Sequence, residues 1–149
     1  MRAPTSTLVV VDAAVLVAAA RGRSSGALLE AGRSASLVTT DRVVHEARRR
    51  IELGLRRPEL LAIIDGLLAE MTVVPVAALT PVLAESEIAL RDAVASRNGS
   101  IRDAHVLALA RSVEADIWTT DRDFAGTGVA SWSTPNLMRG LAGAARDHA

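Results

Sequence analysis

The feature that most constrains the fold of this chain is an alternation of short, strongly apolar runs with segments of helical character. The apolar runs are rich in Val, Ile and Leu, as in parallel strands that are covered on both faces of a sheet. The expected strands are residues 7–11, 37–39, 71–76, 116–119 and 129–132. Strands that alternate with helices predict an α/β fold, in which a parallel sheet is covered by helices.

The segments between these strands carry signals that begin and end helices. Thr40 is a favoured N-cap residue, Pro58 suits a first helical turn, and Gly32 is placed to end a helix. The expected helices are residues 13–20, 25–31, 41–53, 58–68, 82–95 and 101–113. We expect residues 1–140 to form a single domain and residues 141–149 to form a flexible tail.

The composition excludes several kinds of chemistry. The 149 residues are half hydrophobic and include no cysteine, so the core needs no disulfides, and thiol, cysteine–zinc and iron–sulfur chemistry are excluded. The 17 basic residues are all arginines and balance 17 acidic residues, so neither a Schiff-base lysine nor a P-loop lysine is available. With two Trp, one Phe and no Tyr, nucleic-acid binding would rest on arginines, backbone amides and metal rather than on stacking.

The N-terminal apolar run has two readings. Arg2 followed by residues 8–20 resembles a signal peptide. Asp12 interrupts this run, however, and the run is too short to span a membrane. We therefore expect a buried strand that ends in a functional aspartate, in a cytoplasmic protein.

Four acidic residues stand where an expected strand meets a helix, or just inside the following helix: Asp12, Glu46, Asp103 and Asp121. Asp12 and Asp121 follow strands directly, and ligands of parallel sheets bind at the carboxyl ends of the strands. If the fold brings the four together, their repulsion must be relieved by protons or by a bound cation. Oxygen ligands suit Mg²⁺ or Mn²⁺, and Asp123 is an accessory ligand candidate. The pattern points to metal-assisted phosphodiester chemistry.

Each of these residues also has a purely structural interpretation. Asp12 could cap the helix that follows it. Asp103 could do the same within a near capping box that begins at Ser100. Asp121 could form an Asx turn, and Glu46 could be a solvated edge of its helix.

The histidines and the arginine run are weaker signals. His105 follows Asp103 by two residues, so helical spacing predicts that it points away from Asp103. His45 and His148 are not expected to be ligands either. Residues 48–50 are three consecutive arginines, which form either a solvated face or a contact for RNA phosphates or an acidic partner.

Four segments, in this order and spacing, resemble PIN-domain ribonucleases of the VapC toxin type. They are VVVDAAVL, the strand and helix of residues 38–47, RDAHVLALA, and TTDRDF at residues 119–124. The resemblance covers about residues 7–132. Family members often carry Ser, Thr or Asn within two residues of the first aspartate, whereas this chain has Ala13 and Ala14, which predicts weaker metal binding or activity.

The resemblance implies a three-layer α/β/α fold with a mostly parallel sheet of about four to five strands. It implies a Mg²⁺- or Mn²⁺-dependent endoribonuclease that hydrolyses RNA by a two-metal-type mechanism. Asp12, Glu46, Asp103 and Asp121 would be the catalytic ligands, with Asp123 as a further metal ligand. Two alternatives are a catalytically weak or inactive scaffold, and a Rossmann-like enzyme, which is disfavoured because no Gly-rich turn follows the first strand.

The resemblance also implies partners. Such proteins commonly form homodimers and are inhibited by a small antitoxin protein. Two successive expected helices carry many apolar side chains, part of which we expect to bind an amphipathic antitoxin segment. These residues are Val43, Val44, Ile51, Leu55, Leu60, Leu61 and Ile64.

Overall fold

The computed structural model describes residues 8–23, 25–94, 101–120, 124 and 127–147. Its centre is a five-stranded sheet with the order β3-β2-β1-β4-β5, in which all four pairings are parallel. The strands are β1 (Leu8–Val11), β2 (Ser36–Thr40), β3 (Thr72–Val74), β4 (Asp116–Trp118) and β5 (Ser131–Trp132). The expected parallel α/β sheet is confirmed.

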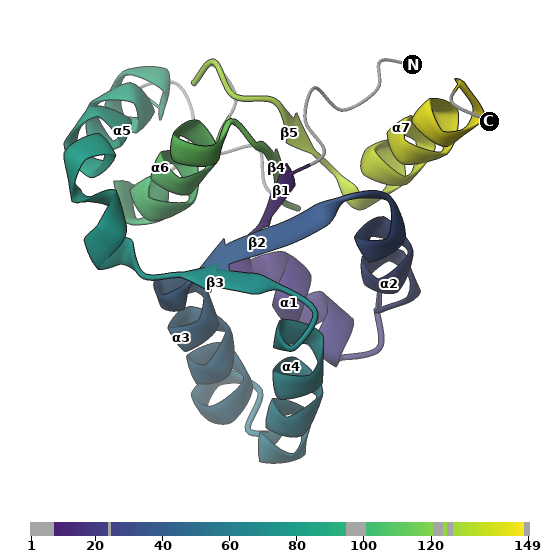
Figure 1. The fold of residues 1–149 in the computed structure, drawn as a ribbon. Helices are drawn as coiled ribbons and strands as arrows, with labels where there is room; N and C mark the ends of the chain where they lie inside the picture. Colours follow the sequence, from purple (N-terminus) through teal and green to yellow (C-terminus); the bar gives the residue numbers. More distant parts are fainter. Residues whose placement is uncertain (1–7, 24, 95–100, 121–123, 125–126, 148–149) are drawn as a thin grey trace.

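Seven α-helices surround the sheet within the described residues, several with a short 3₁₀ or π turn at one end. They are α1 (Ala13–Ala20), α2 (Ser25–Ser34), α3 (Asp41–Arg49) with a π turn (Arg50–Gly54), α4 (Leu61–Leu68) after a 3₁₀ turn (Pro58–Leu60), α5 (Thr80–Val94) after a 3₁₀ turn (Val76–Leu79), α6 (Ala104–Val113) after a 3₁₀ turn (Ile101–Asp103), and α7 (Thr134–Asp147). Helices α1, α3 and α4 lie together on one side of the sheet, and α5 and α6 on the other (Figure 1). This is the expected three-layer α/β/α arrangement.

The core forms around β1, the middle strand. Val9, Val10 and Val11 are fully buried, because β1 pairs with β2 and β4 at its edges and is covered by helices on both faces. A strand buried in this way explains the uninterrupted apolar run in the sequence. None of the described helices has the length and apolar character needed to cross a membrane.

Capping residues determine where a helix begins after a strand. The Thr40 hydroxyl accepts a hydrogen bond from the backbone N–H of Val43 at 3.0 Å, so α3 begins where the sequence predicted. Helix α2 does not end at Gly32 but continues to Ser34. Gly32 therefore lies inside the helix and does not terminate it. A side chain at this position would have room, since the nearest atom belongs to Leu37, 3.9 Å away.

The C-terminal segment is helical, because α7 continues as far as Asp147. The flexibility expected of residues 141–149 stays a prediction. Leu137 and Leu141 lie one helical turn apart and are both buried, and α7 packs against α2. This burial stabilises a helix whose glycines and alanines gave no clear signal in the sequence. Residues 148–149 lie outside the described residues.

The apolar residues proposed to bind an antitoxin mostly serve the core. Four of the seven are buried: Val43, Ile51, Leu60 and Ile64. The other three are half-buried: Val44, Leu55 and Leu61. The expectation is therefore wrong for the four buried side chains, which offer no surface to a partner. The large apolar side chains that these elements do expose are Leu53 and Ile63.

Candidate active site

Asp12 lies directly after β1 and is buried, with 8% of its surface exposed. One carboxylate oxygen accepts a hydrogen bond from the backbone N–H of Val15 at 3.0 Å and thereby caps α1. The other accepts the hydroxyl proton of Thr119, which follows the neighbouring strand β4. The structural and the functional interpretations of Asp12 are therefore compatible, because capping fixes the carboxylate in place at the carboxyl end of the sheet.

Glu46 lies on α3 and is half-buried. Its Oε1 accepts a hydrogen bond from the guanidinium of Arg50 at 2.8 Å, one turn further along. Arg50 begins the π turn that ends α3. An arginine so close limits the rotamers of the glutamate, while the second carboxylate oxygen takes no part in this ion pair.

Asp103 is half-buried at the end of the 3₁₀ turn that precedes α6, with φ −88° and ψ 4°. Its side chain does not cap the helix. The near capping box that the sequence left open involves Ser100, which lies outside the described residues, so that interpretation stays a prediction.

His105 contradicts the sequence interpretation. A ring nitrogen of His105 and carboxylate oxygens of Glu46 and Asp103 all lie within 4.8 Å of one another. The expectation that His105 points away from Asp103 is wrong, because Asp103 belongs to the 3₁₀ turn and the spacing of a regular α-helix does not apply to it. His105 itself is almost completely buried, with 1% exposed.

These side chains meet at a small pocket, here called the acidic pocket. Its volume is about 130 Å³, and Asp12, Glu46 and Asp103 all line it, from three different elements. The other lining residues are Ala13, Ala14, Val43, Arg50, Val106 and Phe124. A pocket of this size exceeds the roughly 10–15 Å³ that a single water requires, and its carboxylates are ligands that suit a divalent cation. The donor set therefore fits a metal ion, although the role of each residue as a ligand stays a prediction.

The two remaining candidates, Asp121 and Asp123, lie outside the described residues. Phe124, which follows them, is buried and forms one wall of the acidic pocket. Ala13 and Ala14 also line this pocket. The polar side chain that family members often carry next to the first aspartate is therefore replaced by alanine in the pocket wall. The Thr119 hydroxyl, directly after the neighbouring strand β4, supplies a polar contact to Asp12.

His105 is held by Thr40 at the end of β2. The Thr40 hydroxyl oxygen lies 2.8 Å from Nδ1 of His105 and also accepts the N–H of Val43. Burial lowers the pKa of His105 to about 4, with a further lowering from the charge of Arg42 and an opposing effect of Asp41. The ring is consequently neutral at physiological pH.

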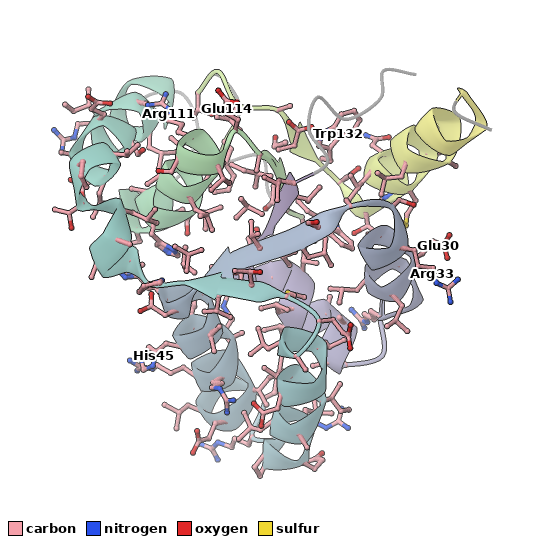
Figure 2. The ribbon with its side chains drawn as sticks, viewed as in Figure 1. Glu30, Arg33, His45, Arg111, Glu114 and Trp132 are labelled. Atoms are coloured by element: carbon pink, nitrogen blue, oxygen red, sulfur yellow. The ribbon has the colours of Figure 1, made fainter. Side chains whose placement is uncertain are left out.

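A larger cavity, here called the arginine cavity, adjoins the acidic pocket. Its volume is about 790 Å³, and it shares Glu46, Arg50 and Asp103 with the acidic pocket. The other lining residues are Arg42, His45, Arg49, Leu53, Gly54, Arg102 and His105. Figure 2 shows His45 on the outer side of α3.

The run of three arginines divides between two roles. Arg48 forms an ion pair with Asp65 and so ties α3 to α4. Arg49 and Arg50 line the arginine cavity. Four arginines around one cavity give a positive surface beside a negative pocket, an arrangement that suits a phosphate chain whose cleavage uses a metal.

Four side chains contact the predicted site residues or each other in ways that the sequence analysis did not predict. They are Thr40, Arg50, His105 and Thr119. Thr119 stands in the TTDRDF segment, so the motif contained it without revealing its bond to Asp12. Arg50 follows Glu46 by four residues, a spacing at which an ion pair on a helix can be expected. Nothing in the sequence signals the contact between Thr40 and His105, which are 65 residues apart.

Comparison with known proteins gives one family and a consistent fold. The profile of the PIN domain family matches residues 10–142. No curated protein sequence matches the chain.

Among solved structures, the chain is similar to VapBC2 from Rickettsia felis bound to a DNA fragment from their promoter, with a TM-score of 0.68, 13% identity, and coverage of 85% of this chain and 98% of that chain. It is similar to VapC20 of Mycobacterium tuberculosis, a sarcin–ricin loop cleaving toxin, with a TM-score of 0.61, 18% identity, and coverage of 82% and 96%. A toxin–antitoxin complex from Klebsiella pneumoniae gives a TM-score of 0.53, 17% identity, and coverage of 85% and 97%. At these identities the likeness is one of fold.

Proposed function

Because this chain belongs to the PIN-domain family, we propose that it is a divalent-metal-dependent endoribonuclease, and that it is the toxin of a toxin–antitoxin pair. The observation that carries the proposal is the convergence of Asp12, Glu46 and Asp103, from three separate elements, on one pocket. The pocket lies at the carboxyl end of β1, where parallel sheets bind their ligands. A bound cation would relieve the repulsion between carboxylates that converge in this way.

Asp12, Glu46 and Asp103 hold the metal in this proposal, with Asp121 and Asp123 as further ligands. Mg²⁺ or Mn²⁺ bound there would supply a Lewis acid, lower the pKa of water and stabilise the charge of the leaving oxygen. The protein fixes two of its own carboxylates beforehand: Val15 and Thr119 orient Asp12, and Arg50 orients Glu46. Such preorganisation means that little rearrangement is needed when the substrate binds.

The arginine cavity binds the RNA backbone. Arg42, Arg49 and Arg102 line it and offer planar, permanently charged donors that match phosphate geometry. Because the cavity and the acidic pocket share Glu46, Arg50 and Asp103, a chain bound along the arginines passes directly over the carboxylates. The formal net charge of zero is compatible with this, since the arginines act locally.

The partners proposed are a small antitoxin protein and a second copy of the chain. The antitoxin is supported by the fold, which the chain shares with VapBC2 and with a toxin–antitoxin complex. Exposed Leu53, which lines the arginine cavity, provides an apolar contact next to the arginines for an acidic antitoxin segment.

The test is cleavage of a structured RNA by the purified chain with Mg²⁺, with Mn²⁺ or with EDTA. We expect metal-dependent products that carry a 5′-phosphate and a 3′-hydroxyl, because hydrolysis by water leaves these ends. Cleavage that persists in EDTA, or that Asp12→Asn leaves unchanged, would contradict the proposal. The matched control is Asp116→Asn, the same chemical change at another buried aspartate.

One observation favours a second candidate, a catalytically weak PIN scaffold. Ala13 and Ala14 line the acidic pocket at positions where a polar side chain would support the metal. Titration with Mn²⁺ by calorimetry separates the two functions. A nuclease must bind the ion at a site that Asp12→Asn weakens, whereas a scaffold has no need of such a site.

A further inference from the structure

His105 brings a nitrogen ligand to a site that otherwise consists of carboxylates. It comes from α6, whereas Glu46 comes from α3, and a ring nitrogen lies within 4.8 Å of the nearest carboxylate oxygens of Glu46 and Asp103. Ligand atoms bound to one first-row ion lie up to about 4.4 Å apart, since each bond is about 2.0–2.2 Å long. The observed separation therefore needs only small side-chain rotations to admit an ion.

The orientation of the ring identifies which nitrogen is available. Nδ1 lies 2.8 Å from the Thr40 hydroxyl, and this is the one hydrogen bond of the ring among the described residues. Every fully buried side-chain nitrogen and oxygen that the structure describes has a hydrogen-bond partner, so Nε2 cannot be sealed in the core. His105 lines the arginine cavity, and because Nδ1 faces Thr40, Nε2 is the ring nitrogen left to face the cavity.

Thr40 positions the ring. The hydroxyl oxygen has two lone pairs and accepts the N–H of Val43 at 3.0 Å with one of them. The second can accept a hydrogen bond from Nδ1–H, and in that tautomer Nε2 is unprotonated and has a lone pair for an ion. Because Thr40 is also the N-cap of α3, the same residue ties the ring to the helix that carries Glu46.

We propose that His105, through Nε2, joins Glu46 and Asp103 in a mixed nitrogen and oxygen site that binds Mn²⁺ in preference to Mg²⁺. Imidazole is a ligand for first-row transition ions, whereas Mg²⁺ prefers oxygen ligands and water. The inference rests on the metal use in the proposed function but not on RNA cleavage.

The experiment measures Mn²⁺ and Mg²⁺ affinity by calorimetry for the full chain, for His105→Asn and for His45→Asn. Asn keeps a polar group near Thr40 but has no atom at the position of Nε2. We expect His105→Asn to weaken Mn²⁺ binding by at least about tenfold and to change Mg²⁺ binding by less than about threefold. His45→Asn is the matched control, since His45 is exposed and lines the arginine cavity. It should change neither affinity.

A second measurement needs no substitution and so does not depend on the folding of a variant. Pulsed electron paramagnetic resonance of the Mn²⁺ complex detects directly coordinated nitrogen, and labelling all histidines with ¹⁵N changes the coupling. We expect a histidine nitrogen coupling in the parent chain. Absence of the coupling in the parent chain, or equal loss of Mn²⁺ and Mg²⁺ affinity in His105→Asn, would overturn the inference.

The outcomes separate this inference from the proposed function. If the chain shows the nitrogen coupling but does not cleave RNA, the mixed metal site is supported and the nuclease function is refuted. If the chain cleaves RNA but shows no nitrogen coupling and binds Mn²⁺ and Mg²⁺ equally well, the nuclease function is supported and the mixed metal site is refuted.

Discussion

Two buried aspartates lie at opposite ends of two neighbouring parallel strands. Asp12 follows β1 at its carboxyl end, and Asp116 begins β4 at its amino end, where it pairs in register with Val9. Asp116 is the more buried of the two, with 2% of its surface exposed against 8% for Asp12. By burial alone, Asp116 would be the more unusual acid.

Their surroundings differ much more than their burial does. Asp116 accepts a hydrogen bond from the indole N–H of Trp132 at 3.0 Å, a contact that ties β4 to β5. Asp12 shares a pocket with carboxylates from α3 and from the 3₁₀ turn before α6. A buried acid with a neutral donor supports the fold, whereas acids that converge against their mutual repulsion indicate a site for a cation.

The largest expected effect is on catalysis at the carboxyl end. Asp12→Asn should lower the rate of RNA cleavage by at least about a thousandfold, because a lost ligand removes several kcal/mol of charge stabilisation. Its free energy of unfolding without metal should stay the same or rise, since Asn still caps α1 and one repelling charge is removed. The measurements are cleavage with Mn²⁺ and urea unfolding in EDTA.

The matched change at the amino end tests the comparison directly. Asp116→Asn keeps an acceptor for Trp132 and should cleave RNA at the parental rate. Equal losses of activity in the two variants would mean that neutralising a buried acid harms catalysis through the fold. The contrast between the two ends of the sheet would then carry no functional meaning.

A second effect depends on pH and concerns His105. The folded-state pKa of about 4 lies below the ordinary value of 6.5, so the unfolded chain binds the proton more readily. The stability that the neutral ring supports is therefore complete above about pH 6.5 and is lost as the pH falls toward 4. Between pH 7 and pH 5 this loss should be about 2 kcal/mol.

Urea unfolding in EDTA at these two pH values measures this loss in the parent chain and in His105→Asn. The variant should lose less stability on acidification, and the difference between the two chains isolates the ring from the other titrating groups. His45→Asn should follow the parent, because this histidine is exposed on α3. A parental response in His105→Asn would refute the prediction.

A third, smaller effect returns to the amino end of the sheet. Asp116→Ala removes the acceptor for the Trp132 indole and should lower the free energy of unfolding by about 1–2 kcal/mol. The activity of the folded fraction should not change, because Asp116 does not line the acidic pocket. Glu30→Ala is a surface control on α2 (Figure 2), expected to alter stability by less than about 0.5 kcal/mol.

The sequence predicted the parallel sheet well because its strands are self-contained signals. The runs that became β1, β2 and β4 are apolar on both faces, and Thr40 marked the start of α3 correctly. Helix α7 gave no such signal, since its stability comes from burial of Leu137 and Leu141 against a helix distant in the sequence. Long-range packing of this kind is absent from any local pattern.

The site was predictable to a similar degree and for similar reasons. Asp12 ends β1, and Glu46 lies on the helix that follows β2, so the topology brings these two acids to the carboxyl end of the sheet, where Asp103 joins them from the turn before α6. The position of His105 did not follow, because it depends on a single 3₁₀ turn before α6 and on a contact with Thr40 from another element. Asp121 and Asp123 stay predictions.

The smallest expected effect extends the carboxyl-end site outward, from the carboxylates to the arginine cavity. Arg49 is exposed and lines this cavity, so Arg49→Ala should weaken RNA binding by about 0.5–1 kcal/mol while leaving the rate at saturating RNA unchanged. The slope of log affinity against log salt should fall by about 0.7, the value for one phosphate contact on a single strand.

The measurement is RNA binding at several salt concentrations in Ca²⁺ or EDTA, where cleavage does not interfere. Arg33→Ala removes the same charge from α2, away from both cavities that contain the acidic residues (Figure 2). If Arg33→Ala and Arg49→Ala lower the slope equally, RNA responds to the total charge of the protein, and the arginine cavity is not its binding surface. A slope that falls in Arg49→Ala alone places the phosphate chain beside the acidic pocket, because the cavity and the pocket share Glu46, Arg50 and Asp103.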